Sequence, residues 1–136
     1  MTVRAPVALA DLTEKEWQAQ VIELAQTLGW KHYFTYRSKR SPAGWPDLQL
    51  VRERVLFLEL KTEAGKLSHP QRQWLRALTT AGAEAYVCRP RHLPKLAAVL
   101  AVRRYPVHVP FNRSARDAAD HLREELAIEL ATVKAA

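Results

Sequence analysis

Three charged residues lie at the ends of two apolar segments that flank a short charged turn. Asp47 begins the first segment, whereas Glu59 and Lys61 end the second. One or two carboxylates, with waters and substrate phosphates, are the usual ligands of Mg²⁺ in proteins, and a nearby ammonium group offsets developing negative charge. These residue types therefore indicate metal-assisted chemistry on a phosphate. Taken singly, each motif is common, and a surface salt bridge between Lys61 and one acid is the alternative explanation.

The spacing of the two segments predicts an antiparallel hairpin that brings the acids together. With a turn at residues 52–54, Val51 lies opposite Val55, and the same register places Asp47 opposite Glu59. Because side chains alternate between the faces of a strand, the hairpin leucines share one face and the acids share the other. Like charges directly opposite each other are unfavourable, so a proton, a basic side chain or a divalent cation must lie between them. The turn has no glycine, so an even shift of the register stays open.

Two more polar residues lie on otherwise apolar stripes of expected helices. Glu14 does so in a helix expected over about 14–28, and Gln71 in a helix expected over about 68–80. A first-turn charge at the helix dipole and a capping box are the ordinary roles for these two residues. The functional alternative places both at the rim of the acid site, with Glu14 as a further acid and Gln71 as a polar orienting group.

The remaining segments predict a mixed α/β fold. Residues 32–37 and 83–89 are typical of strands, and helices are expected over about 92–102 and 115–133. The resulting order of helix, three strands, helix and strand predicts a mixed sheet flanked by helices. The last helix has an apolar stripe that either completes the core or forms a dimer interface. We favour the dimer interface, because most soluble oligomers are symmetric assemblies of identical chains.

Length and composition indicate a single small domain with a polyanionic partner. The chain has 136 residues and a formal net charge of +7, which suits nucleic acid, although solubility alone is the alternative. Cys88 is the only cysteine, so no intrachain disulfide and no thiolate zinc site is expected, and its apolar neighbours predict a buried thiol. No apolar segment is long enough to span a membrane, and no signal peptide is recognisable, so a cytoplasmic location is expected.

The two motifs, at residues 46–47 and 59–61, together resemble the signature of PD-(D/E)xK nucleases. With the helix acid, the Gly-x-Pro-Asp turn and the segment GKLSHPQRQWLRAL, the chain resembles the VRR-NUC family of this superfamily over about residues 13–100. The resemblance implies a restriction-endonuclease-like αβββαβ core over 13–102. Residues 103–136 then form a C-terminal extension with one helix, which is a candidate dimerisation element.

The resemblance also implies a Mg²⁺-dependent endodeoxyribonuclease, with Mn²⁺ as a substitute. Stand-alone members of the family are associated with branched DNA, including four-way (Holliday) junctions, and often act as homodimers. The implied metal ligands are Asp47, Glu59, the Leu60 carbonyl and Glu14. The implied catalytic residues are Asp47, Glu59, Lys61, Gln71 and Glu14.

Basic residues beside the motifs are candidates for contacts with DNA phosphates, although a solvated loop is the alternative. They are Arg37, Lys39, Arg40, Lys66 and Arg72. The leading hypothesis is a nuclease selective for branched DNA such as junctions or flaps. Two others stay open. A non-catalytic nucleic-acid-binding module would show salt-sensitive binding without cleavage, whereas a restriction-type nuclease would cut plain duplex into discrete fragments.

Overall fold

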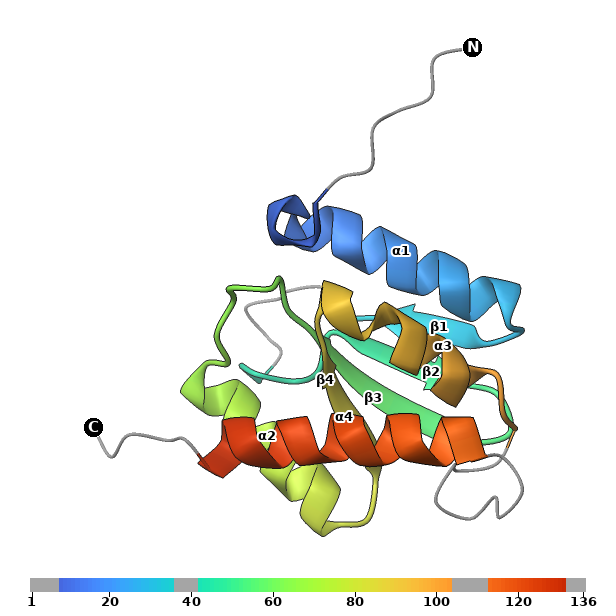
Figure 1. Cartoon of the computed structure of the whole chain (residues 1–136). Helices are drawn as coiled ribbons and strands as arrows, with labels where there is room; N and C mark the ends of the chain where they lie inside the picture. Colours follow the sequence, from blue (N-terminus) through green and yellow to red (C-terminus); the bar gives the residue numbers. More distant parts are fainter. Residues whose placement is uncertain (1–7, 36–41, 104–112, 132–136) are drawn as a thin grey trace.

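A four-stranded mixed sheet with helices packed on it forms the centre of the molecule (Figure 1). The structure, a computed structural model, describes residues 8–35, 42–103 and 113–131. The elements in chain order are η1 (Leu9–Asp11), α1 (Glu14–Thr27), β1 (Lys31–Phe34), β2 (Leu48–Val51), β3 (Val55–Leu60), α2 (His69–Thr80), β4 (Glu84–Cys88), η2 (Pro90–His92), α3 (Leu93–Leu100) and α4 (Arg113–Ala131). The predicted αβββαβ core is therefore confirmed.

The strands follow one another in the order β1-β2-β3-β4 across the sheet. β1 pairs with β2 and β2 with β3 in antiparallel fashion, whereas β3 and β4 are parallel. Parallel neighbours need a crossover, and α2 provides it. Within the hairpin Val51 is paired with Val55 and Leu48 with Leu58. This is the register predicted from the sequence, and it places the start of β2 and the end of β3 at the same end of the sheet.

Capping boxes define the first turns of α1 and α2, as predicted. Thr13 Oγ1 accepts a hydrogen bond from the Glu16 N–H at 3.1 Å, and the Glu16 carboxylate accepts one from the Thr13 N–H at 3.1 Å. Ser68 and Gln71 make the corresponding reciprocal pair at the start of α2. Both boxes satisfy backbone N–H groups that a helix start leaves without intrahelical partners, so each helix begins at a defined residue.

The first face of the sheet carries the main hydrophobic core. The hairpin leucines pack there with residues of α1 and α3, and the indole N–H of Trp17 donates to the Cys88 carbonyl at 3.0 Å. Cys88 itself is fully buried, and this burial raises the pKa of its thiol. A thiol that resists ionisation is a poor nucleophile, so the prediction of a buried core cysteine is confirmed.

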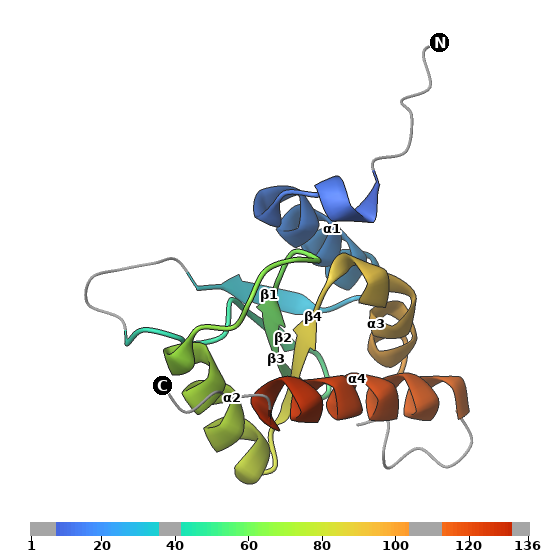
Figure 2. The same cartoon turned by 60° about the vertical axis from the view of Figure 1, so that its left-hand side comes forward.

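α4 crosses the β4 edge of the sheet and contributes to the packing on both faces (Figure 2). Its Leu122 is buried in the first-face core, whereas Leu126 packs with Leu75 of α2 and Val87 of β4 on the second face. The helix thereby covers a strand edge that would otherwise be open to unwanted pairing. Its apolar stripe is thus used within one copy of the chain, and the predicted homodimer needs a different surface.

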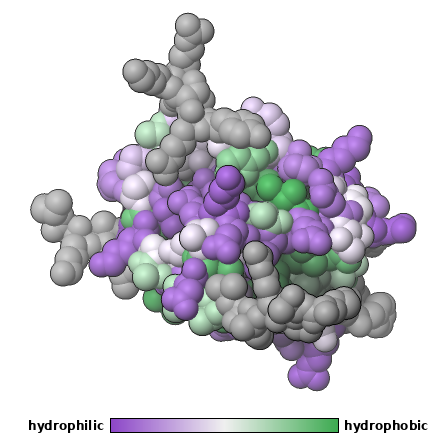
Figure 3. All heavy atoms as spheres, turned by 90° about the horizontal axis from the view of Figure 1, so that it is seen from above, coloured by the Kyte–Doolittle hydropathy of each residue, from purple (hydrophilic) through white to green (hydrophobic). Residues whose placement is uncertain are grey.

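The surface on the α1 side is largely hydrophilic, with a limited hydrophobic area (Figure 3). Within the three described ranges, no helix has the length and apolar character needed to cross a membrane.

Candidate active site

The turn that leads into β2 is held directly against the start of α2. Gly44 has φ +91°, a conformation that favours glycine, and a Cβ at this position would lie 2.3 Å from the carbonyl carbon of Pro70. The backbone at Gly44 can approach the backbone at Pro70 this closely only because Gly44 has no side chain. The Trp74 indole N–H also donates to the Ala43 carbonyl at 3.1 Å. The turn and the helix therefore form one unit, and it connects the Asp47 motif to the Gln71 motif.

The backbone around Asp47 is held by hydrogen bonds on both sides. The Pro46 carbonyl accepts from the Thr35 hydroxyl at 3.0 Å and from the Gln49 side-chain amide at 2.8 Å, and the Asp47 carbonyl accepts from the Thr35 N–H at 2.8 Å. The Asp47 carboxylate in turn accepts from the Leu60 N–H through Oδ2 at 3.0 Å. Its side chain is therefore directed at the end of β3, where the Glu59 motif lies.

Glu59 is 1% exposed and is held from α2. Its Oε1 accepts a hydrogen bond from Gln71 Nε2 at 2.9 Å, while Gln71 Oε1 accepts from the Ser68 N–H at 2.8 Å. Because its oxygen is engaged by the helix cap, the Gln71 amide can only present its N–H₂ to Glu59. One Gln71 side chain therefore both completes the helix cap and contacts the Glu59 carboxylate, and its part in catalysis stays a prediction.

The burial of Glu59 and the charge of Asp47 favour the binding of a proton or a cation between the two acids. Burial first, and then the nearby Asp47 carboxylate, raise the pKa of Glu59 to about 9, and the charge of Lys61 opposes this shift. Within the described residues, Glu59 Oε2 is buried and receives no hydrogen bond from a donor. Two carboxylates can approach each other stably only if a proton or a positive ion is shared between them. The donor set, an orphaned carboxylate oxygen beside a second carboxylate, fits a hard divalent cation.

Lys61 lies next to this pair because the parallel pairing of β3 and β4 extends one residue beyond the strand. The Lys61 N–H donates to the Cys88 carbonyl at 3.1 Å, and the same carbonyl accepts from the Trp17 indole. The structure thus brings Asp47, Glu59 and Lys61 together, as the hairpin register predicts, and the start of α2 adds Gln71.

Glu14 is not part of this group. It is the first residue of α1 and is exposed, and its carboxylate accepts from the Gln18 side-chain amide at 3.5 Å. In the part of the chain that the structure describes, no three His, Cys, Asp or Glu side chains lie close enough to hold a metal ion together. The assignment of Glu14 to a metal stays a prediction that this arrangement does not support.

The candidate DNA-binding residues divide into three cases. Arg37, Lys39 and Arg40 lie outside the described residues. Lys66 is exposed in the loop before α2. The Arg72 guanidinium instead donates to the Glu129 carbonyl near the end of α4, so it already has a partner within the protein.

Arg89 is a residue of the site region that the sequence analysis did not single out. It is buried, and its guanidinium donates to the Thr62 carbonyl at 2.6 Å and the Gly65 carbonyl at 2.5 Å, while pairing with Glu129 at 2.5 Å. Arg89 thereby links the loop that follows Lys61 to α4. The only signal in the sequence was an arginine directly after a buried strand, which by itself indicates no role.

The fold and these side chains together define an α/β protein of the nuclease-like class. A comparison with protein families matches residues 6–92, more than half of the chain, to the VRR-NUC domain. The chain therefore belongs to the VRR-NUC family, which is part of the PD-(D/E)xK nuclease superfamily. Membership implies a nuclease with DNA as its substrate. No curated protein and no solved structure matches the chain significantly.

Proposed function

We propose that the chain is a metal-dependent endodeoxyribonuclease selective for branched DNA such as four-way junctions or flaps. The observation that carries the metal dependence is the buried Glu59 carboxyl, whose pKa is raised to about 9 beside Asp47. A site that must lose a proton before it can be fully charged is suited to exchange that proton for a cation. The preference for branched DNA is supported by the family resemblance.

Asp47, Glu59 and the Leu60 carbonyl would hold Mg²⁺, with Mn²⁺ as a substitute. When bound there, the ion supplies an acidified water and a Lewis acid for a phosphoryl oxygen. The chain's own contribution is orientation. The Leu60 N–H holds Asp47 Oδ2 at 3.0 Å, and Gln71 Nε2 holds Glu59 Oε1 at 2.9 Å. In each of the two carboxylates, one oxygen is therefore held by a hydrogen bond and the second oxygen would be available to the ion.

Lys61 would act on the phosphate and the attacking water. Its backbone is fixed by the Cys88 carbonyl, and its charge lies close enough to Glu59 to oppose the rise of that residue's pKa. An ammonium group in this place offsets the negative charge that accumulates on the phosphate in the transition state, and it can help to position or deprotonate the water.

The test is incubation with labelled four-way junction, flap, duplex and single-stranded DNA, in Mg²⁺ or in EDTA. We expect cleavage of branched DNA in Mg²⁺ only. Glu59→Gln should bind the same DNA and lose at least 100-fold in cleavage rate, on the order of what one lost electrostatic contact to the reacting group removes. Cleavage by Glu59→Gln at the rate of the unchanged chain contradicts the proposed site.

Two other outcomes identify the alternative functions. Salt-sensitive binding without cleavage of any substrate indicates a binding module, and discrete fragments from plain duplex indicate a restriction-type nuclease.

A homodimer is the second part of the proposal, because two symmetric cuts in a junction suit a twofold assembly. Its interface would use a surface other than the buried stripe of α4. Size-exclusion chromatography with light scattering measures the mass directly, and a mass of one chain at micromolar concentration contradicts the dimer.

A further inference from the structure

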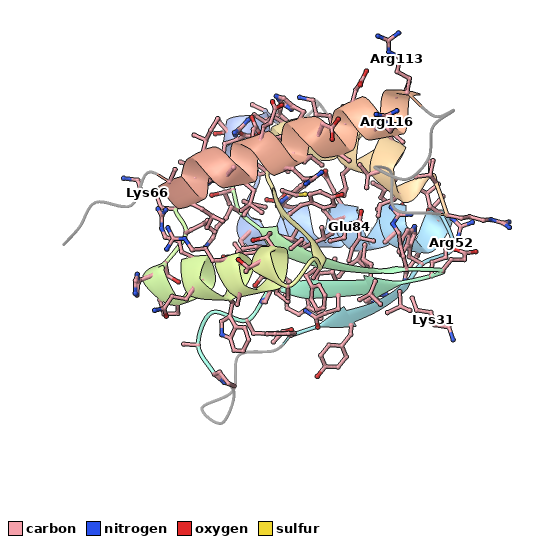
Figure 4. The ribbon with its side chains drawn as sticks, turned by 90° about the horizontal axis from the view of Figure 1, so that it is seen from below. Lys31, Arg52, Lys66, Glu84, Arg113 and Arg116 are labelled. Carbon is pink, nitrogen blue, oxygen red and sulfur yellow. The ribbon has the colours of Figure 1, made fainter. Side chains whose placement is uncertain are left out.

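Within the described residues, no helix covers the second face of the sheet over β1, β2 and the start of β3. Paired residues across these strands point to the same side, so two rows of side chains lie on this face. One row holds Tyr33, Gln49 and Phe57, and the other holds Lys31, Val51 and Val55. Among the described residues the second-face cluster under α2 reaches Phe57 but not the β1 side of this face, and Figure 4 shows Lys31 pointing away from the sheet.

This open face is continuous with the acid site. Asp47 lies two residues before Gln49, and Glu59 two residues after Phe57, so both acids come from the same side of the hairpin. Tyr33 is two residues before Thr35, whose N–H donates to the Asp47 carbonyl at 2.8 Å. It is therefore a diagonal neighbour of Asp47, a relation that places Cα atoms roughly 7–8 Å apart. That separation corresponds to about two steps of a stacked strand, at roughly 3.4 Å each.

Tyr33 is, in the part of this face that the structure describes, an aromatic side chain that is available to a ligand. It is 67% exposed, although it is large and apolar. Trp45, another aromatic side chain near the site, packs its ring edge-to-face against Phe57 and Trp74, with centroids 5.6 and 4.9 Å away. Trp45 thus stabilises the turn that carries Asp47, whereas Tyr33 has an open ring face.

We propose that Tyr33 stacks on an unpaired nucleobase adjacent to the phosphate that is cut, with Lys31 close to the neighbouring backbone. The proposal rests on the proposed nuclease function and names the class of DNA that this site accepts. Aromatic side chains stack on bases of any sequence, and a basic surface holds the backbone, here in a chain of net charge +7. A base inside an intact duplex presents no free ring face, so the site selects DNA with an opened base at the cut.

The test is equilibrium binding in EDTA, measured by fluorescence anisotropy with a fluorescein-labelled single-stranded oligonucleotide and with a blunt duplex of the same sequence. We expect Tyr33→Ala to weaken single-strand binding about tenfold and to change duplex binding less than about twofold. Tyr33→Phe should bind within about twofold of the unchanged chain, because the ring is retained. Ile128→Ala is the matched control, since Ile128 is 63% exposed on α4, away from this face.

Three results overturn the proposal: an unchanged affinity of Tyr33→Ala for single strands, an equal loss in Tyr33→Phe, or an equal loss on duplex. Light scattering on the same variants adds a fourth, because conversion of a dimer to a monomer by Tyr33→Ala would assign this face to an interface between two copies. If the unchanged chain shows the Tyr33-dependent binding but cleaves nothing in Mg²⁺, stacking is supported and the nuclease proposal fails.

Discussion

The buried carboxyl group of Glu59 lowers the free energy of unfolding of the metal-free protein at pH values above its ordinary pKa. Its pKa in the folded protein, about 9, lies above its ordinary value of 4.5. Between these two pH values the folded protein keeps a proton that the unfolded chain has lost. The free energy of unfolding therefore falls as the pH rises through this window, and the stability present below pH 4.5 is lost by about pH 9.

Glu59→Gln should for this reason stabilise the metal-free protein at pH 8, by on the order of a few kcal/mol, because the amide needs no proton. At pH 4 both side chains are neutral in the folded and the unfolded chain, so the difference should largely vanish. Urea unfolding at the two pH values in EDTA measures this. Equal stabilisation at both values, or none at pH 8, contradicts the assigned environment of Glu59.

Gln71 combines a structural and a functional contact, and two variants separate them. Ser68→Ala removes the cap hydroxyl but leaves the Ser68 N–H on Gln71 Oε1 and the Gln71 contact with Glu59. Gln71→Ala keeps the bond from its backbone N–H to Ser68 Oγ, but removes the side-chain half of the capping box together with the contact to Glu59. Each should lose about 1 kcal/mol of stability. Only Gln71→Ala should also lose at least about tenfold in kcat, because Glu59 is no longer oriented. Similar cleavage rates in the two variants would show that Gln71 is a cap alone.

At the scale of the elements, the docking of the turn before β2 on α2 decides where Asp47 lies. Three contacts make this docking: the close approach of Gly44 to Pro70, the Trp74 indole on the Ala43 carbonyl, and the packing of Trp45 on Trp74. The hairpin alone places the acids opposite each other. The position of α2 adds Gln71, so the site is built from a hairpin and a helix start that are joined through this turn.

Gly44→Ala tests the docking, with Gly82→Ala as its control. Both glycines have a positive φ, +91° and +85°, so both variants lose about 1 kcal/mol to backbone strain. At position 82 no atom lies within 4 Å of an added Cβ, whereas at position 44 the Cβ overlaps the α2 backbone. Gly44→Ala should therefore lose a further 1–3 kcal/mol, roughly the cost of overpacking. Equal midpoints in urea unfolding would mean that the turn is free to move away from α2.

At the scale of the whole molecule, α4 adds to the family domain a helix that the core needs. The family match ends at residue 92, yet Leu122 and Leu126 of α4 are buried against the sheet and its helices. Arg89 and Arg72 connect the same helix to the loop after Lys61 and to α2. The C-terminal segment is therefore part of the body that positions the site.

Leu122→Ala should lose about 2–5 kcal/mol of stability, because it leaves a cavity in the core. Ile128 on the same helix is 63% exposed. Ile128→Ala should therefore change the free energy of unfolding by no more than about 0.5 kcal/mol. Thermal unfolding at several protein concentrations distinguishes a core from a dimer interface. A loss that shrinks as the concentration rises would assign the stripe to a dimer interface instead.

The order of residue types along the chain was enough to predict the local features of this protein and one long-range feature. Capping residues and apolar periodicity predicted the two capped helices, and the alternation of leucines with polar residues predicted the hairpin register. That register was sufficient to pair Asp47 with Glu59, because a slip of one residue would expose the leucines.

The contacts between separate elements could be seen only in the folded protein. The tertiary structure placed Gln71 on Glu59, left Glu14 outside the acid pair, and packed the stripe of α4 into the core of the same chain. Periodicity reports which side of a helix is apolar, but it does not report against what that side packs. The same limit applies to Tyr33, whose exposure depends on where the helices stop covering the sheet, a property of the assembled layers that no local pattern of residues contains.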